Sequence, residues 1–179
     1  MSPSIGPDTS RLLSIGMAFL AGVLAGAVLL TAAPGLAGGP AEMAPDPDNP
    51  PTSTTSAGPS CYDGQVNPNA GWVHEVAVGN SYAVTLNATV VHDAGTELDA
   101  HVVPRSGNGY ELALRTVEHT PERTLDCERV RTRFTMGVSL PTSYERLVVT
   151  VNGRELVSAT REDTTADLYP LPNPIDATG

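Results

Sequence analysis

Hydrophobic residues recur at every second position through much of residues 61–160. In residues 130–140, for example, Phe134, Met136 and Val138 alternate with polar residues or glycine. This alternation is typical of a β-strand that buries one face and exposes the other. The segments that follow it are residues 72–78, 82–90, 98–102, 110–115, 130–140, 146–151 and 155–159. No helical period appears among them, so we expect an all-β domain of about seven strands.

The junction between the last two segments carries the strongest turn signal in the domain. Asn152 and Gly153 separate them, and this pair tolerates the positive φ angles that a tight type I′ turn requires. A sheet this small is stable only when its apolar face is covered. The pattern therefore predicts an antiparallel β-sandwich, in which two sheets pack through their apolar faces.

An apolar run without charged side chains covers residues 12–33. As a helix the run would rise about 33 Å, enough to cross a hydrocarbon core of about 30 Å. Arg11 before the run and acidic residues after it place residues 1–11 in the cytoplasm and the rest of the chain outside. Small residues around Ala37 also fit a signal peptidase site. The sequence thus leaves two alternatives, a single-pass membrane anchor and a secreted protein cleaved near Ala37.

The segments on either side of the predicted domain lack any apolar period. Residues 34–60 are rich in proline, glycine, serine and threonine, and residues 161–179 contain three prolines in five positions. Such compositions bury too little surface to offset the entropy of ordering the chain. We expect a disordered stalk over residues 34–60, a folded domain over residues 61–160 and a disordered tail over residues 161–179.

Charge and composition exclude several classes of function. Acidic residues outnumber basic ones 20 to 10, for a formal net charge of -10, whereas nucleic-acid phosphates select for lysine and arginine. Every basic residue is arginine, so Schiff-base, P-loop and Ser-Lys chemistries have no lysine to use. Motifs of the GxSxG, SxxK and HExxH types are absent. We expect no nucleic-acid partner, no catalysis and no cofactor.

Cys61 and Cys127 are the two cysteines of the chain, and both follow the apolar run. A pair of cysteines in an exported domain is most simply a disulfide. The alternative, a pair of metal-binding thiolates, lacks the CxxC spacing. The histidines also lack ligand spacing such as HxH or HxxxH, so no metal site is predicted. One of them, His74, falls on the face of its predicted strand that carries Trp72 and Val76.

Three arginines lie on the polar face of residues 130–140 and just before it. Arg129, Arg131 and Arg133 form a candidate site for an anionic glycan or a carboxylate, because guanidinium groups bind such partners in a fork. The simpler interpretation is ion pairing across neighbouring strands. The acidic residues expected as partners are Glu97, Asp99, Glu111 and Glu118. Asn87 begins the one N-glycosylation sequon and is placed on a polar face.

The order of Cys61, Trp72 and Cys127 resembles the Cys, Trp, Cys order of immunoglobulin-like domains. This resemblance spans the whole predicted domain and implies an immunoglobulin-like sandwich. Leu125 departs from the pattern, because it stands where the family has a tyrosine two residues before the second cysteine. No predicted strand precedes Cys61.

Composition and layout resemble those of small exported surface proteins of extremely halophilic archaea. The shared features are absent lysine, abundant acidic residues, few aromatics, one anchor and one β domain. Self-repulsion of an acidic surface is screened when salt is high. The first hypothesis is an anchored, non-catalytic domain that contacts the lipid bilayer through residues 12–33 and an envelope protein or glycan through its β domain. The second is a pilin-like filament subunit, although Pro34-Gly35 interrupts the apolar helix that such a subunit needs.

Overall fold

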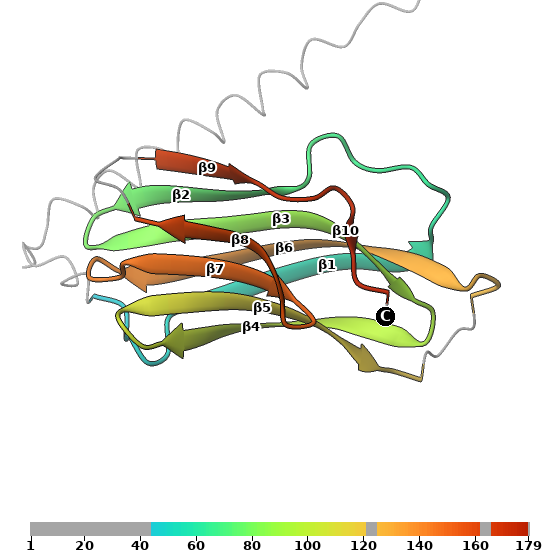
Figure 1. The fold of residues 1–179 in the computed structure, drawn as a ribbon, viewed down its shortest axis with the longest axis horizontal. Helices are drawn as coiled ribbons and strands as arrows, with labels where there is room; N and C mark the ends of the chain where they lie inside the picture. Colours follow the sequence, from blue (N-terminus) through green and yellow to red (C-terminus); the bar gives the residue numbers. More distant parts are fainter. Residues whose placement is uncertain (1–43, 121–124, 162–165, 179) are drawn as a thin grey trace, which may run out of the picture. The chain divides into compact units, whose positions relative to one another are not determined.

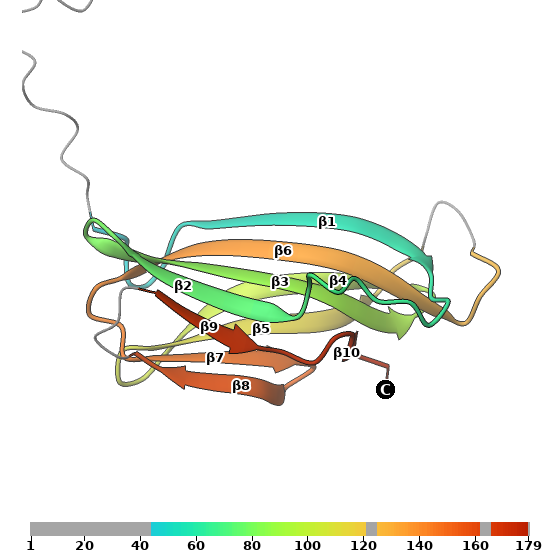
Figure 2. The ribbon, with the colours of Figure 1, turned by 90° about the horizontal axis from the view of Figure 1, so that it is seen from above.

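The computed structural model describes residues 44–120, 125–161 and 166–178, which form ten β-strands in two sheets and no helix. The predicted all-β class is confirmed. The larger sheet has the order β1 (Thr52–Cys61), β6 (Arg129–Pro141), β3 (Ser81–Asp93), β2 (Trp72–Val78) and β9 (Ala166–Pro170), with β10 (Ile175–Asp176) also paired to β3. The smaller sheet has the order β4 (Thr96–Arg105), β5 (Gly109–Glu118), β7 (Arg146–Val151) and β8 (Arg154–Thr160). In Figure 1 the strands of the two sheets overlap, whereas Figure 2, turned by 90°, shows β1, β6, β3 and β2 on one side and β7 and β8 on the other.

One hydrophobic core lies between the two sheets. Leu86 and Met136 enter it from the larger sheet, and Leu112 and Val149 enter it from the smaller one, each with 0% of its surface exposed. Alternation explains the arrangement, because every second side chain of a strand points to the same face. Each of the seven predicted segments lies within one of the strands β2 to β8, so their prediction is confirmed.

Most strand pairs are antiparallel, as expected, but two are parallel. In the smaller sheet β5 runs parallel to β7, from Gly109 opposite Arg146 to Leu114 opposite Val151. The chain leaves the smaller sheet after β5, forms β6 in the larger sheet and then returns as β7. Parallel neighbours need such a crossover, since a tight hairpin joins only antiparallel strands. The second parallel pair joins β10 to β3.

The predicted stalk over residues 34–60 is wrong for its last part, because residues 52–60 belong to β1. All ten side chains of β1 are exposed, so the strand leaves no apolar period in the sequence. Backbone pairing with β6 holds it, from Thr52 opposite Val138 to Cys61 opposite Val130. A strand held by its backbone alone gives no signal to a search for buried faces. The prediction that no strand precedes Cys61 is wrong for the same reason.

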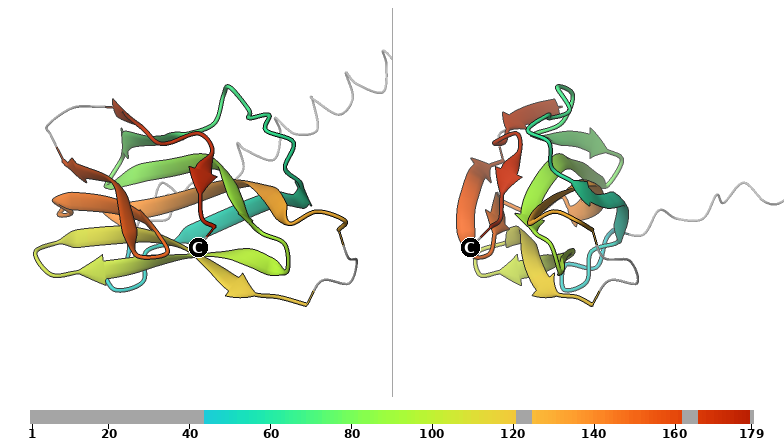
Figure 3. Two further views of the ribbon diagram at one scale, coloured as in Figure 1. Left: turned by 45° about the vertical axis from the view of Figure 1, so that its right-hand side comes forward. Right: turned by 90° about the vertical axis from the view of Figure 1, so that its right-hand side faces the viewer.

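The predicted tail over residues 161–179 also contains ordered strands. β9 pairs with β2 in antiparallel fashion, and β10 extends the larger sheet along the end of β3. Ile175 is fully buried in the core, and Leu171 and Ala177 are nearly so. In Figure 3 these C-terminal strands, in red, lie beside β2 and β3, in green. The folded domain therefore extends beyond residues 61–160 at both ends.

Cys61 and Cys127 form a disulfide with a Cα–Cα distance of 5.9 Å, as predicted. Cys61 ends β1, and Cys127 lies two residues before β6, so the bond joins neighbouring strands of one sheet. In immunoglobulin domains the corresponding bond joins the two sheets. The position of the disulfide therefore departs from the immunoglobulin-like pattern, and the structure supports the two-sheet β architecture alone.

The turn between β7 and β8 has the predicted conformation. Asn152 has φ 49° and Gly153 has φ 78°, both in the left-handed region that a type I′ turn requires. The Asn152 side chain also accepts a hydrogen bond from the backbone N–H of Thr116 at 2.9 Å, which ties the turn to β5.

The predictions for residues 1–11, for the apolar run at 12–33 and for cleavage near Ala37 concern residues outside those the structure describes. Within the described ranges, no helix has the length and hydropathy needed to cross a membrane.

Candidate functional site

Polar side chains stand in register on the outer face of the larger sheet. Alternate residues of β6 are buried in the core, so Arg133 and Thr135 project to the opposite face. Strand pairing places Thr135 between Thr55 on β1 and Asn87 on β3. It also places Arg133 beside Thr89 on β3. Three strands thus bring residues that are far apart in the sequence to one surface.

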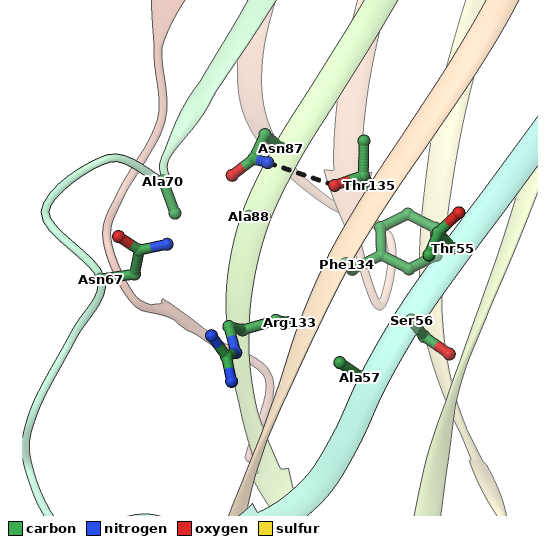
Figure 4. A pocket seen from close by; sticks show the side chains of 10 residues that line it. All are labelled: Thr55, Ser56, Ala57, Asn67, Ala70, Asn87, Ala88, Arg133, Phe134 and Thr135. Atoms are coloured by element: carbon green, nitrogen blue, oxygen red, sulfur yellow. Dashed lines mark hydrogen bonds between the residues drawn. The ribbon is translucent and has the colours of Figure 1, made fainter. Parts of the chain in front are cut away.

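The side chains of Thr55, Asn87, Arg133 and Thr135 line a hollow of about 310 Å³, shown in Figure 4. A second hollow of about 270 Å³, to which Thr89 contributes, lies next to the first and shares Asn67 and Arg133 with it. We call the two adjacent hollows together the outer groove. In Figure 4 the side chain of Arg133 extends from β6 across β3 toward the loop that carries Asn67. The polar residues that line the outer groove include Thr55, Asn67, Asn87, Thr89, Arg133 and Thr135.

The three candidate arginines differ in their partners. Arg129 forms an ion pair with Asp176 at 3.0 Å. Arg131 forms one with Asp63 at 3.1 Å and donates a second hydrogen bond to the carbonyl of Gln65 at 2.8 Å. Within the described part of the chain, Arg133 has no ion-pair or hydrogen-bond partner. Its guanidinium is therefore available to a ligand.

The acidic partners expected for these arginines are wrong. Glu97, Asp99, Glu111 and Glu118 lie on β4 and β5, in the smaller sheet, whereas the arginines lie on β6 in the larger sheet. Of the true partners, Asp63 lies before the first predicted strand of the domain, and Asp176 lies in the predicted tail over residues 161–179. The polar pattern shows which residues face outward, but it does not show which strands are neighbours.

Thr89 lies at the floor of the outer groove with 1% of its surface exposed. Its hydroxyl has no hydrogen-bond partner among the described residues. A buried polar group without a partner costs about 1–3 kcal/mol. The hydroxyl of Thr89 is thus a second unpartnered polar group in the groove, beside Arg133.

Asn87, the predicted glycosylation site, is half-buried in the groove. Its side-chain nitrogen, the atom to which a glycan would be attached, donates a hydrogen bond to the Thr135 hydroxyl at 3.1 Å. A glycan on Asn87 would therefore fill the outer groove. Whether Asn87 carries one remains a prediction of the sequon.

A second polar cluster is centred on Glu75 of β2, which is 3% exposed. Oε2 of Glu75 has no hydrogen-bond partner within the described ranges. Burial raises the pKa of the Glu75 carboxyl above its ordinary value; Asp167 adds to the rise, and Tyr144 and Arg161 oppose it. The Arg161 guanidinium stacks over the rings of Tyr82 and Tyr144, with distances of 5.4 and 5.9 Å to their centroids.

No pattern in the sequence predicted this cluster. In residues 72–78 the face with Trp72 and Val76 was the apolar one, yet the structure buries Val73 and Glu75. Trp72 instead lies half-buried on the outer face, where its indole N–H donates to the carbonyl of Asn69 at 2.9 Å. A buried glutamate reverses the apparent polarity of the strand.

Replacing Glu75 with glutamine is expected to stabilise the protein at neutral pH. The folded-state pKa of Glu75 lies above 4.5, so the folded protein holds this proton more tightly than the unfolded chain does. Wild-type stability therefore falls as the pH rises from about 4.5 through the folded-state pKa. The glutamine variant lacks this loss, so its advantage in unfolding free energy should grow with pH. Urea denaturation of both proteins at about pH 4 and about pH 8 measures the change.

The titration of His92 also changes the stability with pH, but it does so equally in both proteins. Burial lowers the pKa of His92, so its contribution to stability is lost as the pH falls below 6.5. This trend is opposite to that of Glu75, but it is common to both proteins and cancels in their difference. A difference that stays constant or shrinks with rising pH would contradict the expectation.

His92 is fully buried, with its two ring nitrogens 2.9 Å from the hydroxyls of Thr96 and Thr132. His101 and His119 lie beside Asp99 and Glu97 at the surface. Across residues 44–120, 125–161 and 166–178, no group of three or more histidine, cysteine or acidic side chains could hold a metal ion.

Fold and site together define a two-sheet β domain with a polar groove on one outer face. Comparison of the chain with protein-family models, with curated proteins and with solved structures finds no significant match.

Proposed function

We propose that this chain is an extracytoplasmic β-sandwich module that binds a component of the cell envelope through the outer groove and catalyses no reaction. The observation that carries the proposal is the free guanidinium of Arg133 in a groove of hydroxyl and amide side chains. The groove is built on β1, β3 and β6, so its side chains are held in place by strand pairing before a ligand arrives.

The disulfide, the apolar run and the charge of the chain support a location outside the cytoplasm. The disulfide between Cys61 and Cys127 fits an oxidising compartment. The apolar run at residues 12–33 would hold the module at the membrane, or would direct its secretion if it is cleaved near Ala37. The net charge of -10 without lysine fits a surface that works in high salt, as in the surface proteins of halophilic archaea that the chain resembles.

A large side chain placed in the outer groove should block the binding of the envelope component, which tests the proposed function. Thr55 is exposed on β1 and lines the groove, so Thr55→Trp should place an indole ring in it without touching the core. The full chain would be immobilised in detergent and exposed to polysaccharide and protein fractions of a cell envelope. We expect wild type to bind one fraction and Thr55→Trp to lose about tenfold or more in affinity for it.

Thr54→Trp is the matched control. It makes the same chemical change on the same exposed strand, but the neighbouring residue of a strand points to the opposite face. This variant should bind as wild type does. Equal loss in both variants, no loss in either, or no binding of any fraction by wild type would overturn the proposed function.

A further inference from the structure

We propose that the ligand of the outer groove is an acidic saccharide, with the carboxylate of a uronic acid unit on Arg133 and the hydroxyls of its ring on the amides and hydroxyls beside it. This inference rests on the proposed function and specifies the class of ligand that the groove takes. It starts from two polar groups in the same depression, Arg133 and Thr89, that have no partner within the described residues.

Arg133 sets the charge of the ligand. Arg131, two residues earlier on the same face, is neutralised by Asp63, so the groove holds one unbalanced positive charge. Among the residues that the structure describes, no acidic side chain lines either hollow of the groove. A carboxylate there would accept paired hydrogen bonds from the guanidinium fork. Because the whole protein carries a net charge of -10, long-range attraction does not favour an anion, and its binding must come from this local contact.

The remaining polar groups set the class of molecule that carries the carboxylate. Asn67 and Asn87 offer amides, and Thr55, Thr89 and Thr135 offer hydroxyls, so the groove presents both donors and acceptors. A sugar ring carries hydroxyls that pair with both kinds of group. Ala57 and Ala70 supply small apolar contacts between them. A hollow of about 310 Å³ lies at the lower end of the usual range for small-molecule sites, which suits one or two sugar rings.

Matched ligands test the contributions of the carboxylate and of the sugar ring separately. An oligogalacturonate and its methyl ester have the same rings and hydroxyls, but the ester carries no charge. Isothermal titration of the full chain in detergent should give a dissociation constant about tenfold lower for the acid than for the ester. Free acetate, which has the carboxylate without the ring, should bind about tenfold or more weakly than the oligogalacturonate.

Substitutions of Arg133 test whether its guanidinium binds the carboxylate of the ligand. Arg133→Gln should remove the preference for the acid, and Arg133→Lys should restore part of it, because lysine keeps the charge and loses the fork. Arg115→Gln, at an exposed position on β5 of the smaller sheet, makes the same change in net charge and should leave the preference intact. Thermal unfolding of each variant checks that the fold is retained.

The outcomes distinguish this inference from the proposed function. Equal affinity for acid and ester, or a preference that survives Arg133→Gln, would overturn the acidic saccharide. If an envelope fraction still bound in a manner blocked by Thr55→Trp, the groove would have a different ligand and the proposed function would stand. Acetate binding as tightly as the oligogalacturonate would show a site for small anions and would overturn the saccharide.

Discussion

Removing the disulfide between Cys61 and Cys127 is expected to lower the free energy of unfolding by about 4 kcal/mol. The bond closes a loop over a sequence separation of 66 residues, and the chain-entropy model gives this figure for a loop of that length. A second effect is local. Because every side chain of β1 is exposed, the strand lacks buried contacts to replace the bond. The Cys61→Ser/Cys127→Ser variant should therefore lose stability overall and lose β1 first.

Two measurements check this expectation. Urea denaturation of the full chain at fixed salt gives the change in free energy, with Ser60→Ala, next to Cys61 on the same exposed strand, as the control. Hydrogen exchange should show faster exchange of the backbone amides of β1 than of β3 in the disulfide-free variant. A loss below about 1 kcal/mol, or β1 amides that stay as protected as those of β3, would contradict it.

Leu86→Ala is expected to destabilise the domain by about 2–5 kcal/mol. Leu86 lies on β3 in the middle of the larger sheet, with 0% of its surface exposed, and packs in the core between the two sheets. Truncation removes buried methyl groups and leaves a cavity that the strands on either side cannot fill without moving.

Leu168→Ala makes the same chemical change at an exposed position. Leu168 lies on the edge strand β9 with 64% of its surface exposed, so the change should cost about 0.5 kcal/mol or less. Denaturant unfolding of the two variants under the same conditions compares them directly. Similar losses would mean that the inner face of β3 is not the core of the domain.

The sequence predicted the parts of the fold that depend on the type of side chain at each position. Alternation of buried and exposed residues revealed β2 to β8, and Asn152-Gly153 revealed the turn between β7 and β8. β1 and β9 were missed because they bury few or none of their side chains and depend on backbone pairing. Crossing of the chain between sheets, which makes β5 and β7 parallel, leaves no local signal at all.

The sequence predicted only part of the candidate site, because alternation shows the direction of a side chain but not its neighbours. The outward direction of Arg133 follows from the alternation in β6, but its lack of a partner depends on which segments lie nearby. Asn67 comes from a loop, and Thr55 from the supposed stalk, so only the folded sheet brings them to Arg133. Glu75 was missed because a charged residue on a strand is expected to face solvent.

The position of the disulfide also determines how the domain would respond to tension. A load pulling on the N-terminal side of the domain first meets the segment before β1, where the Pro47 carbonyl accepts a hydrogen bond from the Tyr110 hydroxyl at 2.9 Å. Once that segment is released, the load reaches the first residue of β1, at the edge of the larger sheet seen in Figure 2. β1 can peel from β6 one residue at a time until the load reaches Cys61, where the covalent bond passes it to the start of β6. Peeling residues 52–60 would release about 30 Å of chain while the core between the sheets stays closed. The strand and its bond would then act together as a short extensible link with a fixed stop.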